Sequence, residues 1–487
     1  MNEIEELRHR ITELQKISDR LEPSPQERSH AQQQIIAYSE NFLQNIEQNK
    51  AYQVTEEKGA GLLASPISED PIPVEEAIRL IRHHVDYPGL NPASGGHLAY
   101  IPGGGIYYAS LGDYLAAVTN RYAGIFFAGP GAVRMENLLI RWLAQILNYP
   151  DDAGGNLTTG GSLANLIGIV TARDAKQIHS RDVERSVIYL SSQAHHSVDK
   201  AIRIAGLKEA VIRYVMLDEH HRILSSALEE QIAQDRRNGL RPFLVIASAG
   251  TTDVGAIDPL AKIGESARRH DLWYHIDAAY GGFFVLTKEG KEKLRGIEMS
   301  DSVVIDPHKG LFLPYGLGVV LVKDRRKLQE SHYYTANYMQ DAANEIEEVS
   351  PAEVSPELTK HFRGMRLWLP LKLHGLKPFR ACLEEKLLLA KYFYHRISGL
   401  GFETGPEPEL SVVTYRYVPE HGDANEFNKR LLEEIVKDGT VFISSTLLNN
   451  KFTLRFACLA FRTHLKTVDT LLMLLQQKRD ELLKNWR

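Results

Sequence analysis

The feature that most constrains the fold is a series of short apolar runs between residues 186 and 323, separated by helix-like stretches. Most of the runs are continuously apolar, and they read SVIYLSS (186–192), AVIRYVML (210–217), PFLVIASAG (242–250), LWYHIDAA (272–279), DSVVID (301–306) and GLGVVLVK (316–323). Continuously apolar strands that alternate with helices indicate a mainly parallel sheet covered on both faces. Because ligands bind at the carboxyl ends of such strands, functional residues are expected at that edge of an α/β fold.

The chain changes character along its length, which predicts three parts. Residues 1–75 read as helices whose apolar positions recur at helical spacing, with too little apolar surface for a core of their own. Residues 76–380 form the large domain with the strands and helices just described. Residues 381–487 begin with a long amphipathic helix and continue with LSVVTYRYV and KFTLRFACL, which predicts a small C-terminal α+β domain. The first part is expected to pack on the main body or on a second subunit.

Composition excludes several classes of function. A net charge of −5 over 487 residues implies neither a nucleic-acid surface nor an acidic tail. The two cysteines, Cys382 and Cys458, suggest neither a disulfide framework nor a cysteine-based zinc site, and they favour a reducing, cytoplasmic compartment. The charged N-terminus does not look like a secretory signal, and no apolar run reaches the roughly 18 residues of a membrane span. No metal site is expected, since no HExxH motif occurs.

Polar residues at the ends of the predicted strands form a first group of candidates. In NLTTGGSLANL, Gly160, Gly161 and Ser162 precede a helix, so free N–H groups and the helix dipole would face an anion. His195 and His196 follow the strand that ends near Ser192. Taken singly, the glycines also fit an ordinary turn and the histidines a helix start or an exposed surface.

Two charged residues at strand ends complete the set. Asp277 ends an apolar strand, where a buried carboxylate needs a partner unless it only caps a turn. Lys309 lies between two apolar runs, and partial desolvation would push its amine towards the neutral, nucleophilic form, although a surface lysine also fits. An anion cradle, a stacking side chain, a carboxylate and an aldimine-forming lysine are together what pyridoxal 5′-phosphate needs from a protein.

The motifs TTGGSLANL, QAHHSVDKA, AGTTDVGAIDPL, HIDAAYGG and DPHKG, followed by HFRGMRLWLPLKLHG, resemble those of the group II pyridoxal-phosphate-dependent amino-acid decarboxylases. This family includes the aromatic L-amino-acid, histidine and glutamate decarboxylases, and the resemblance is strong over about residues 70–390. It implies the fold type I architecture, with a mainly parallel seven-stranded sheet flanked by helices. It also implies a homodimer with intertwined N-terminal segments and an active site at the subunit interface.

The resemblance assigns roles to individual residues. Lys309 would form the internal aldimine, Asp277 would bind the pyridine nitrogen, and His195 would stack on the ring, which makes these three the expected catalytic residues. The other expected cofactor contacts are Ala279 under the ring, Gly161 and Ser162 at the phosphate, His308 next to it, and Thr252 and Asp306 around the cofactor.

The substrate pocket is expected in two further segments. HLAYIPGGGIYY resembles the substrate-binding segment of the family and would bring Tyr100, Ile101 and Gly103 to the pocket wall, with Ile125 and Phe126 nearby. Such a lining favours an aromatic or apolar side chain, although these residues also fit an ordinary core. Arg455 is a candidate for the substrate carboxylate or a structural ion pair, and an acidic substrate such as glutamate stays open.

Decarboxylation of an L-amino acid to an amine and carbon dioxide is the activity that the resemblance implies. Well-known members carry a loop tyrosine that protonates Cα, but the aligned position here is near Pro351 and no tyrosine occurs from 339 to 360. Either His195 or one of the tyrosines nearest the loop (Tyr333, Tyr334 and Tyr338) donates the proton, or oxidative deamination yields an aldehyde. A pyridoxal-phosphate aminotransferase is a further alternative, although DPHKG and QAHHS favour a decarboxylase.

Overall fold

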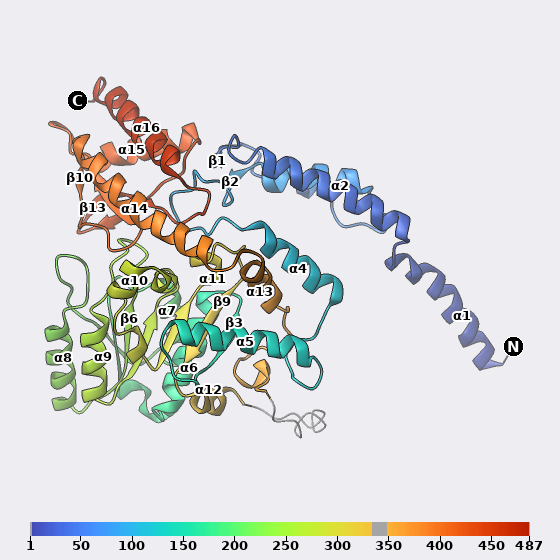
Figure 1. The fold of residues 1–487 in the computed structure, drawn as a ribbon, viewed down its shortest axis with the longest axis horizontal. Coiled ribbons are helices and arrows are strands. Elements are labelled where there is room, and N and C mark those ends of the chain that lie inside the picture. The colour runs from blue at the N-terminus through green and yellow to red at the C-terminus, as the bar shows by residue number, and fades with distance from the viewer. Residues whose placement is uncertain (1, 334–347, 487) are drawn as a thin grey trace. The chain divides into compact units, whose positions relative to one another are not determined.

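The computed structural model describes residues 2–333 and 348–486, and the chain separates into two compact units, Met1–Asn91 and Pro92–Arg487 (Figure 1). No helix in these described residues is both long and apolar enough to cross a membrane.

The first unit consists of three α-helices and one short antiparallel ribbon. The helices are α1 (Glu3–Ser18), α2 (Pro25–Gln44) and α3 (Val74–Ile81), which continues as a π-helical turn (Arg82–Asp86). Capping boxes begin α1 and α2, since Asn2 pairs with Glu5 and Ser24 with Glu27. Strand β1 (Tyr52–Gln53) pairs with β2 (Gly89–Leu90), which extends this unit beyond the predicted boundary at residue 75. None of the three α-helices contains a buried residue.

The second unit is built around the predicted seven-stranded, mainly parallel sheet. Its strands are β3 (Gly154–Thr158), β4 (Ser186–Leu190), β5 (Val211–Tyr214), β6 (Arg241–Ser248), β7 (Trp273–Asp277), β8 (Ser302–Ile305) and β9 (Gly318–Val322), in the order β3-β9-β8-β7-β6-β4-β5. Strands β4 to β8 run parallel, and β9 is antiparallel to both β8 and β3. The six predicted strands are confirmed. The seventh, β3, was not predicted because its sequence, GGNLT, is rich in glycine.

Helices cover both faces of this sheet, because successive side chains of each strand point to opposite faces. In β4, Val187 and Tyr189 join one hydrophobic core, whereas Ile188 and Leu190 join the other. The first core includes residues of α5 (Pro130–Ile146), α8 (Ser225–Arg237) and α9 (Leu260–Arg269). The second includes residues of α6 (Gly161–Ala175), α7 (His196–Ile204) and α12 (Arg325–His332), as Figure 1 allows the reader to follow. Three further helices of this unit are α4 (Tyr107–Thr119), α10 (Lys288–Lys293) and α13 (Gly364–His374).

The C-terminal region has the predicted α+β composition. Its antiparallel sheet has the order β10-β11-β13-β12, with bounds Glu403–Thr404, Val412–Arg416, Lys451–Ala457 and Ser444–Leu448, respectively. Helices α14 (Lys377–Gly399), α15 (Ala424–Asp438) and α16 (Leu465–Leu483) share a core with it, in which the rings of Phe393 and Phe456 stack 4.3 Å apart. The predicted boundary at residue 381 falls inside α14, because that helix already begins at Lys377.

Candidate active site

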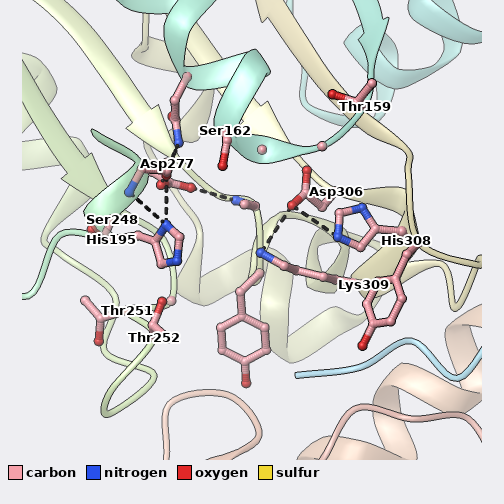
Figure 2. A pocket seen from close by; sticks show the side chains of 18 of the residues that line it. Thr159, Ser162, His195, Ser248, Thr251, Thr252, Asp277, Asp306, His308 and Lys309 are labelled. Atoms are coloured by element: carbon pink, nitrogen blue, oxygen red, sulfur yellow. Dashed lines mark hydrogen bonds and ion pairs between the residues drawn. The ribbon is translucent and has the colours of Figure 1, made fainter. Parts of the chain in front are cut away.

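A cavity of about 520 Å³ lies where β4, β6, β7 and β8 end (Figure 2). Its volume is within the range of small-molecule sites. All the predicted cofactor-binding residues line it: Gly161, Ser162, His195, Thr252, Asp277, Ala279, Asp306, His308 and Lys309. The structure therefore brings together side chains that are more than a hundred positions apart in the sequence.

One wall of the cavity is the N-terminus of α6. No side chain caps this helix, so the N–H groups of its first turn are available to an anion, next to the hydroxyl of Ser162. A Cβ atom on Gly161 would lie 2.9 Å from Oδ2 of Asp306 and 3.3 Å from Cβ of Ala279. A side chain at position 161 would therefore force the Asp306 carboxylate to shift.

Lys309 and its neighbours approach from the strand β8. They lie on the short helix α11 (Pro307–Gly310), which directly follows Asp306. The Lys309 ammonium nitrogen, Nζ, is 3.1 Å from Oδ2 of Asp306, and a quarter of the lysine side chain is exposed. Oδ1 of the buried Asp306 has no hydrogen-bond partner among the described residues. Nδ1 of His308 donates to the carbonyl of Leu317 at 2.6 Å, and burial lowers the pKa of this histidine.

Asp277 and His195 approach from the neighbouring strands. Oδ1 of Asp277 accepts from the N–H of Ala279 at 3.1 Å, and Oδ2 accepts from the side chain of Asn165 at 3.0 Å. His195 caps α7, and its Nδ1 accepts from the N–H of Ser197 at 3.2 Å. Burial lowers the pKa of His195, so the imidazole is neutral near pH 7. Both groups are held by hydrogen bonds and still face the cavity.

Several residues of the lining were not predicted. They are Thr159, Asn165, Ser197, Ser248, Gly250, Thr251, Tyr280, Tyr315 and Gly316, whereas Gly160 of the predicted anion cradle also lines the cavity. Most of them neighbour a predicted residue, and Asn165 follows Gly161 by one helical turn, so the spacing of i and i+4 could have revealed it. The rings of Tyr315 and His308 lie 5.8 Å apart, and Tyr315 directly precedes the strand predicted over 316–323, in a segment to which no role was assigned.

The predicted substrate-binding residues do not line this cavity: Tyr100, Ile101, Gly103, Ile125, Phe126 and Arg455 lie elsewhere. Gly103 instead packs behind the lysine helix, since a Cβ there would lie 2.3 Å from the carbonyl oxygen of His308. The buried Arg455 guanidinium donates to Ser444 at 2.8 Å, to the carbonyl of Asp253 at 2.8 Å and to that of Thr252. It supports the cavity wall from behind, and the substrate roles of all six residues stay predictions.

The tyrosines named for proton donation are only partly described. Tyr334 and Tyr338 lie outside the described residues, whereas Tyr333 is exposed. Pro351, at the aligned position, is buried in a short 3₁₀ helix (Pro351–Glu353). The preceding Ser350 accepts a hydrogen bond from the N–H of Phe126 at 3.0 Å.

The donor set of the cavity fits pyridoxal 5′-phosphate. A phosphate would meet the uncapped helix, a pyridinium nitrogen the Asp277 carboxylate, and an aldehyde the Lys309 amine. Oδ1 of Asp306, which has no hydrogen-bond partner among the described residues, adds a hydrogen-bond acceptor to the cavity lining. In residues 2–333 and 348–486, no group of three or more histidine, cysteine, aspartate or glutamate side chains could hold a metal ion.

Known proteins are similar to this chain in sequence and in fold. Residues 87–418 match the family model described as the pyridoxal-dependent decarboxylase conserved domain. An aromatic-L-amino-acid decarboxylase of Bacillus atrophaeus is 35% identical over 404 residues, which cover 82% of each chain. A phenylacetaldehyde synthase of Arabidopsis thaliana is 28% identical over 438 residues, 87% of this chain and 89% of the relative. The solved structure of Oryza sativa TDC with PLP and tryptamine is 25% identical with a TM-score of 0.89, covering 95% of this chain and 99% of that one.

Proposed function

The chain belongs to the pyridoxal-dependent decarboxylase family, and from this membership we propose that it converts an aromatic L-amino acid to its amine and carbon dioxide, with Lys309 as the cofactor anchor. As a member, it is a pyridoxal-phosphate-dependent amino-acid decarboxylase, a lyase. The observation that carries the residue assignment is a single cavity lined by the Lys309 amine, the Asp277 carboxylate and the uncapped end of α6.

When bound, pyridoxal 5′-phosphate supplies an electron-withdrawing ring that accepts the electron pair left behind by carbon dioxide. Lys309 would anchor the aldehyde carbon, with Asp306 holding the amine in place at 3.1 Å. Asp277 would keep a proton on the ring nitrogen, because its carboxylate would accept a charge-assisted hydrogen bond from that N–H group. His195 would cover one ring face, and the first turn of α6 with Ser162 would bind the phosphate.

The relatives and the cavity lining both favour an aromatic substrate. The Bacillus relative is named for aromatic L-amino acids, and the rice structure contains tryptamine. Lys309 is the only lysine or arginine among the described residues that line the cavity, so an acidic side chain would meet no second strong cation there. The phenols of Tyr280 and Tyr315 in the same lining suit an aromatic ring.

The test is a panel of amino acids scored for release of carbon dioxide by the purified enzyme. We expect tryptophan, tyrosine or phenylalanine to exceed glutamate and aspartate, and the reverse order would refute the aromatic assignment. Lys309→Ala should abolish both turnover and the adduct that borohydride reduction fixes to the protein. A Lys309→Ala protein that still forms this adduct would refute the anchor.

Aldehyde formation is a second candidate, because a phenylacetaldehyde synthase is among the relatives. In that reaction, molecular oxygen and water are consumed, and the amino acid yields aldehyde, carbon dioxide, ammonia and hydrogen peroxide. Assaying amine against aldehyde, ammonia and peroxide separates the two, since stoichiometric peroxide would contradict the amine proposal. Tyr315→Phe, Tyr333→Phe, Tyr334→Phe and Tyr338→Phe then identify the donor as the variant whose product changes from amine to aldehyde.

We also propose that the enzyme acts as a cytoplasmic homodimer with its active site at the subunit interface. On α1, Ile4, Leu7, Ile11, Leu14 and Ile17 are each more than half exposed at helical spacing, an apolar stripe that a second copy would cover. Both cysteines are free, which suits a reducing compartment. Light scattering should give twice the mass of one chain, and a Leu7→Glu/Leu14→Glu variant should shift it towards one.

A further inference from the structure

Behind the Asp277 carboxylate, buried side chains form a continuous series of hydrogen bonds. Nε1 of Trp273 donates to Oγ of Ser302 at 2.8 Å, and this hydroxyl is 2.7 Å from Nδ1 of His275. Nε2 of His275 lies 2.9 Å from Oδ1 of Asn165, and Nδ2 of Asn165 lies 3.0 Å from Oδ2 of Asp277. Asn165, His275 and Ser302 are at most 1% exposed, so water does not compete for these bonds. We call this series the tryptophan relay.

The Asp277 end of the tryptophan relay fixes the positions of its protons. An indole N–H can only donate, so the Ser302 hydroxyl accepts from it and is able to donate its own hydrogen to Nδ1 of His275. A carboxylate only accepts, so Asn165 presents its NH₂ group to Asp277 and its carbonyl to Nε2 of His275. That nitrogen must therefore carry the proton of a neutral imidazole. Burial lowers the pKa of His275 to about 4, in agreement with the neutral form.

Asn165 also connects the relay to His195. Its second N–H donates to Oγ of Ser197 at 3.2 Å, and this hydroxyl lies 2.8 Å from Nδ1 of His195. Because the backbone N–H of Ser197 also donates to this Nδ1, the ring nitrogen is an acceptor and the His195 proton resides on Nε2. A single amide thus orients the carboxylate and also holds the side chain of Ser197, whose backbone N–H selects the tautomer of the imidazole.

A glycine in the middle of α6 makes room for this arrangement. A Cβ on Gly168 would lie 2.7 Å from Cε1 and 3.0 Å from Nδ1 of the His275 ring. Glycine inside a helix costs about 1 kcal/mol relative to alanine, so this position favours space for the imidazole over helix stability.

We propose that Asn165, held in place by His275, is a positioning residue that aims the Asp277 carboxylate at the cofactor and holds Ser197, whose backbone N–H keeps the proton of His195 on Nε2. This inference rests on the proposed function, in which Asp277 meets the ring nitrogen of pyridoxal 5′-phosphate. Asn165 acts through these two side chains and takes no part in bond making itself.

The test uses the full-length apoenzyme titrated with pyridoxal 5′-phosphate, with the visible absorbance of the bound cofactor as the readout. Asn165→Ala should raise the dissociation constant about tenfold or more, because the charged acceptor loses a hydrogen bond. Gly168→Ala should also weaken binding, although it removes no polar group and improves helix propensity. His275→Gln, whose amide N–H can replace Nε2–H, should bind more tightly than His275→Leu, which leaves the Asn165 carbonyl without a donor.

Asn428→Ala is the matched control, because it removes an equally buried amide that is not part of the cavity lining. It should lower the unfolding temperature and leave the dissociation constant unchanged. The proposal for Asn165 would be overturned, without affecting the proposed function, if Asn165→Ala bound the cofactor with wild-type affinity. Equal affinities of His275→Gln and His275→Leu would have the same consequence. A wild-type protein that neither binds the cofactor nor releases carbon dioxide would overturn the proposed function as well.

Discussion

The buried ion pair between Lys360 and Glu136 allows a quantitative prediction about stability. Nζ of Lys360 is 2.6 Å from Oε2 of Glu136, and the two side chains are 0% and 2% exposed. Lys360 also donates to Oδ1 of Asn156 in β3 at 3.1 Å, while Oε1 of Glu136 accepts from the N–H of Gly364 at 3.1 Å. The pair therefore joins α5, the edge strand β3 and the start of α13.

Replacing one partner should cost far more than replacing both. Lys360→Met leaves the Glu136 carboxylate buried without a counter-charge, which should lower the free energy of unfolding by about 3–5 kcal/mol. The double variant Glu136→Met/Lys360→Met removes both charges and leaves only the Gly364 N–H and the Asn156 oxygen unpaired. Its cost should be about 1–3 kcal/mol, below that of either single variant.

Equilibrium unfolding in urea, followed by tryptophan fluorescence, measures these differences. The control is Lys16→Met, because Lys16 lies at the same 2.6 Å from Glu13 but the two side chains are 66% and 51% exposed. It should change the free energy of unfolding by no more than about 0.5 kcal/mol. Two results would refute burial as the reason why the effects of the two substitutions are not additive. In the first, the double variant loses as much free energy of unfolding as the two single variants together. In the second, Lys16→Met loses as much free energy of unfolding as Lys360→Met.

Three further predictions concern the site and its support. Gly161→Ala should weaken binding of pyridoxal 5′-phosphate in an absorbance titration, because its Cβ would displace the Asp306 oxygen that contacts Lys309; unchanged affinity would contradict the close packing. Arg455→Lys should lower the urea midpoint, because the guanidinium holds two backbone carbonyls, whereas a selective rise in KM at unchanged stability would support the substrate role predicted from the sequence. Although burial raises the pKa of Glu229, hydrogen bonds from Ser266, His270 and Arg269 bring it from the usual 4.5 down to about 2. Its stabilising effect is then complete above pH 4.5 and lost as the pH falls towards 2, so Glu229→Gln should flatten the unfolding temperature over this window.

The sequence was most informative where local composition decides structure. Strands buried on both faces must be continuously apolar, so β4 and β6 to β9 were recognisable without knowledge of their neighbours. Asp277 and Gly161 were recognisable because the first ends an apolar strand and the second begins a helix. Thr252, Ala279, Asp306 and His308 were assigned only through the resemblance to the family. Strand β3 was missed because it takes its place by pairing with β9, about 160 positions later, and not by its own propensity.

Long-range polar contacts gave no local signal. The bonds of Asn165 to His275 and Asp277 span more than a hundred positions. The i, i+4 spacing from Gly161 indicates that Asn165 shares a helix face with it, but no periodicity or motif identifies the partners of its amide. The position of Arg455 was equally indistinct, because an arginine that holds backbone carbonyls and one that binds a substrate have the same sequence context on a strand.

The order of the large sheet has a consequence for synthesis of the chain on the ribosome. Strand β3 is the first of the seven strands to be made, but its only neighbour in the sheet, β9, is the last. Until residue 322 has left the ribosome, β3 and the anion-binding turn that follows it have no partner in the sheet. A nascent chain that already carries Asp277 and Lys309 therefore still lacks a positioned phosphate site. We expect cofactor capture by stalled nascent chains to begin abruptly once β9 emerges.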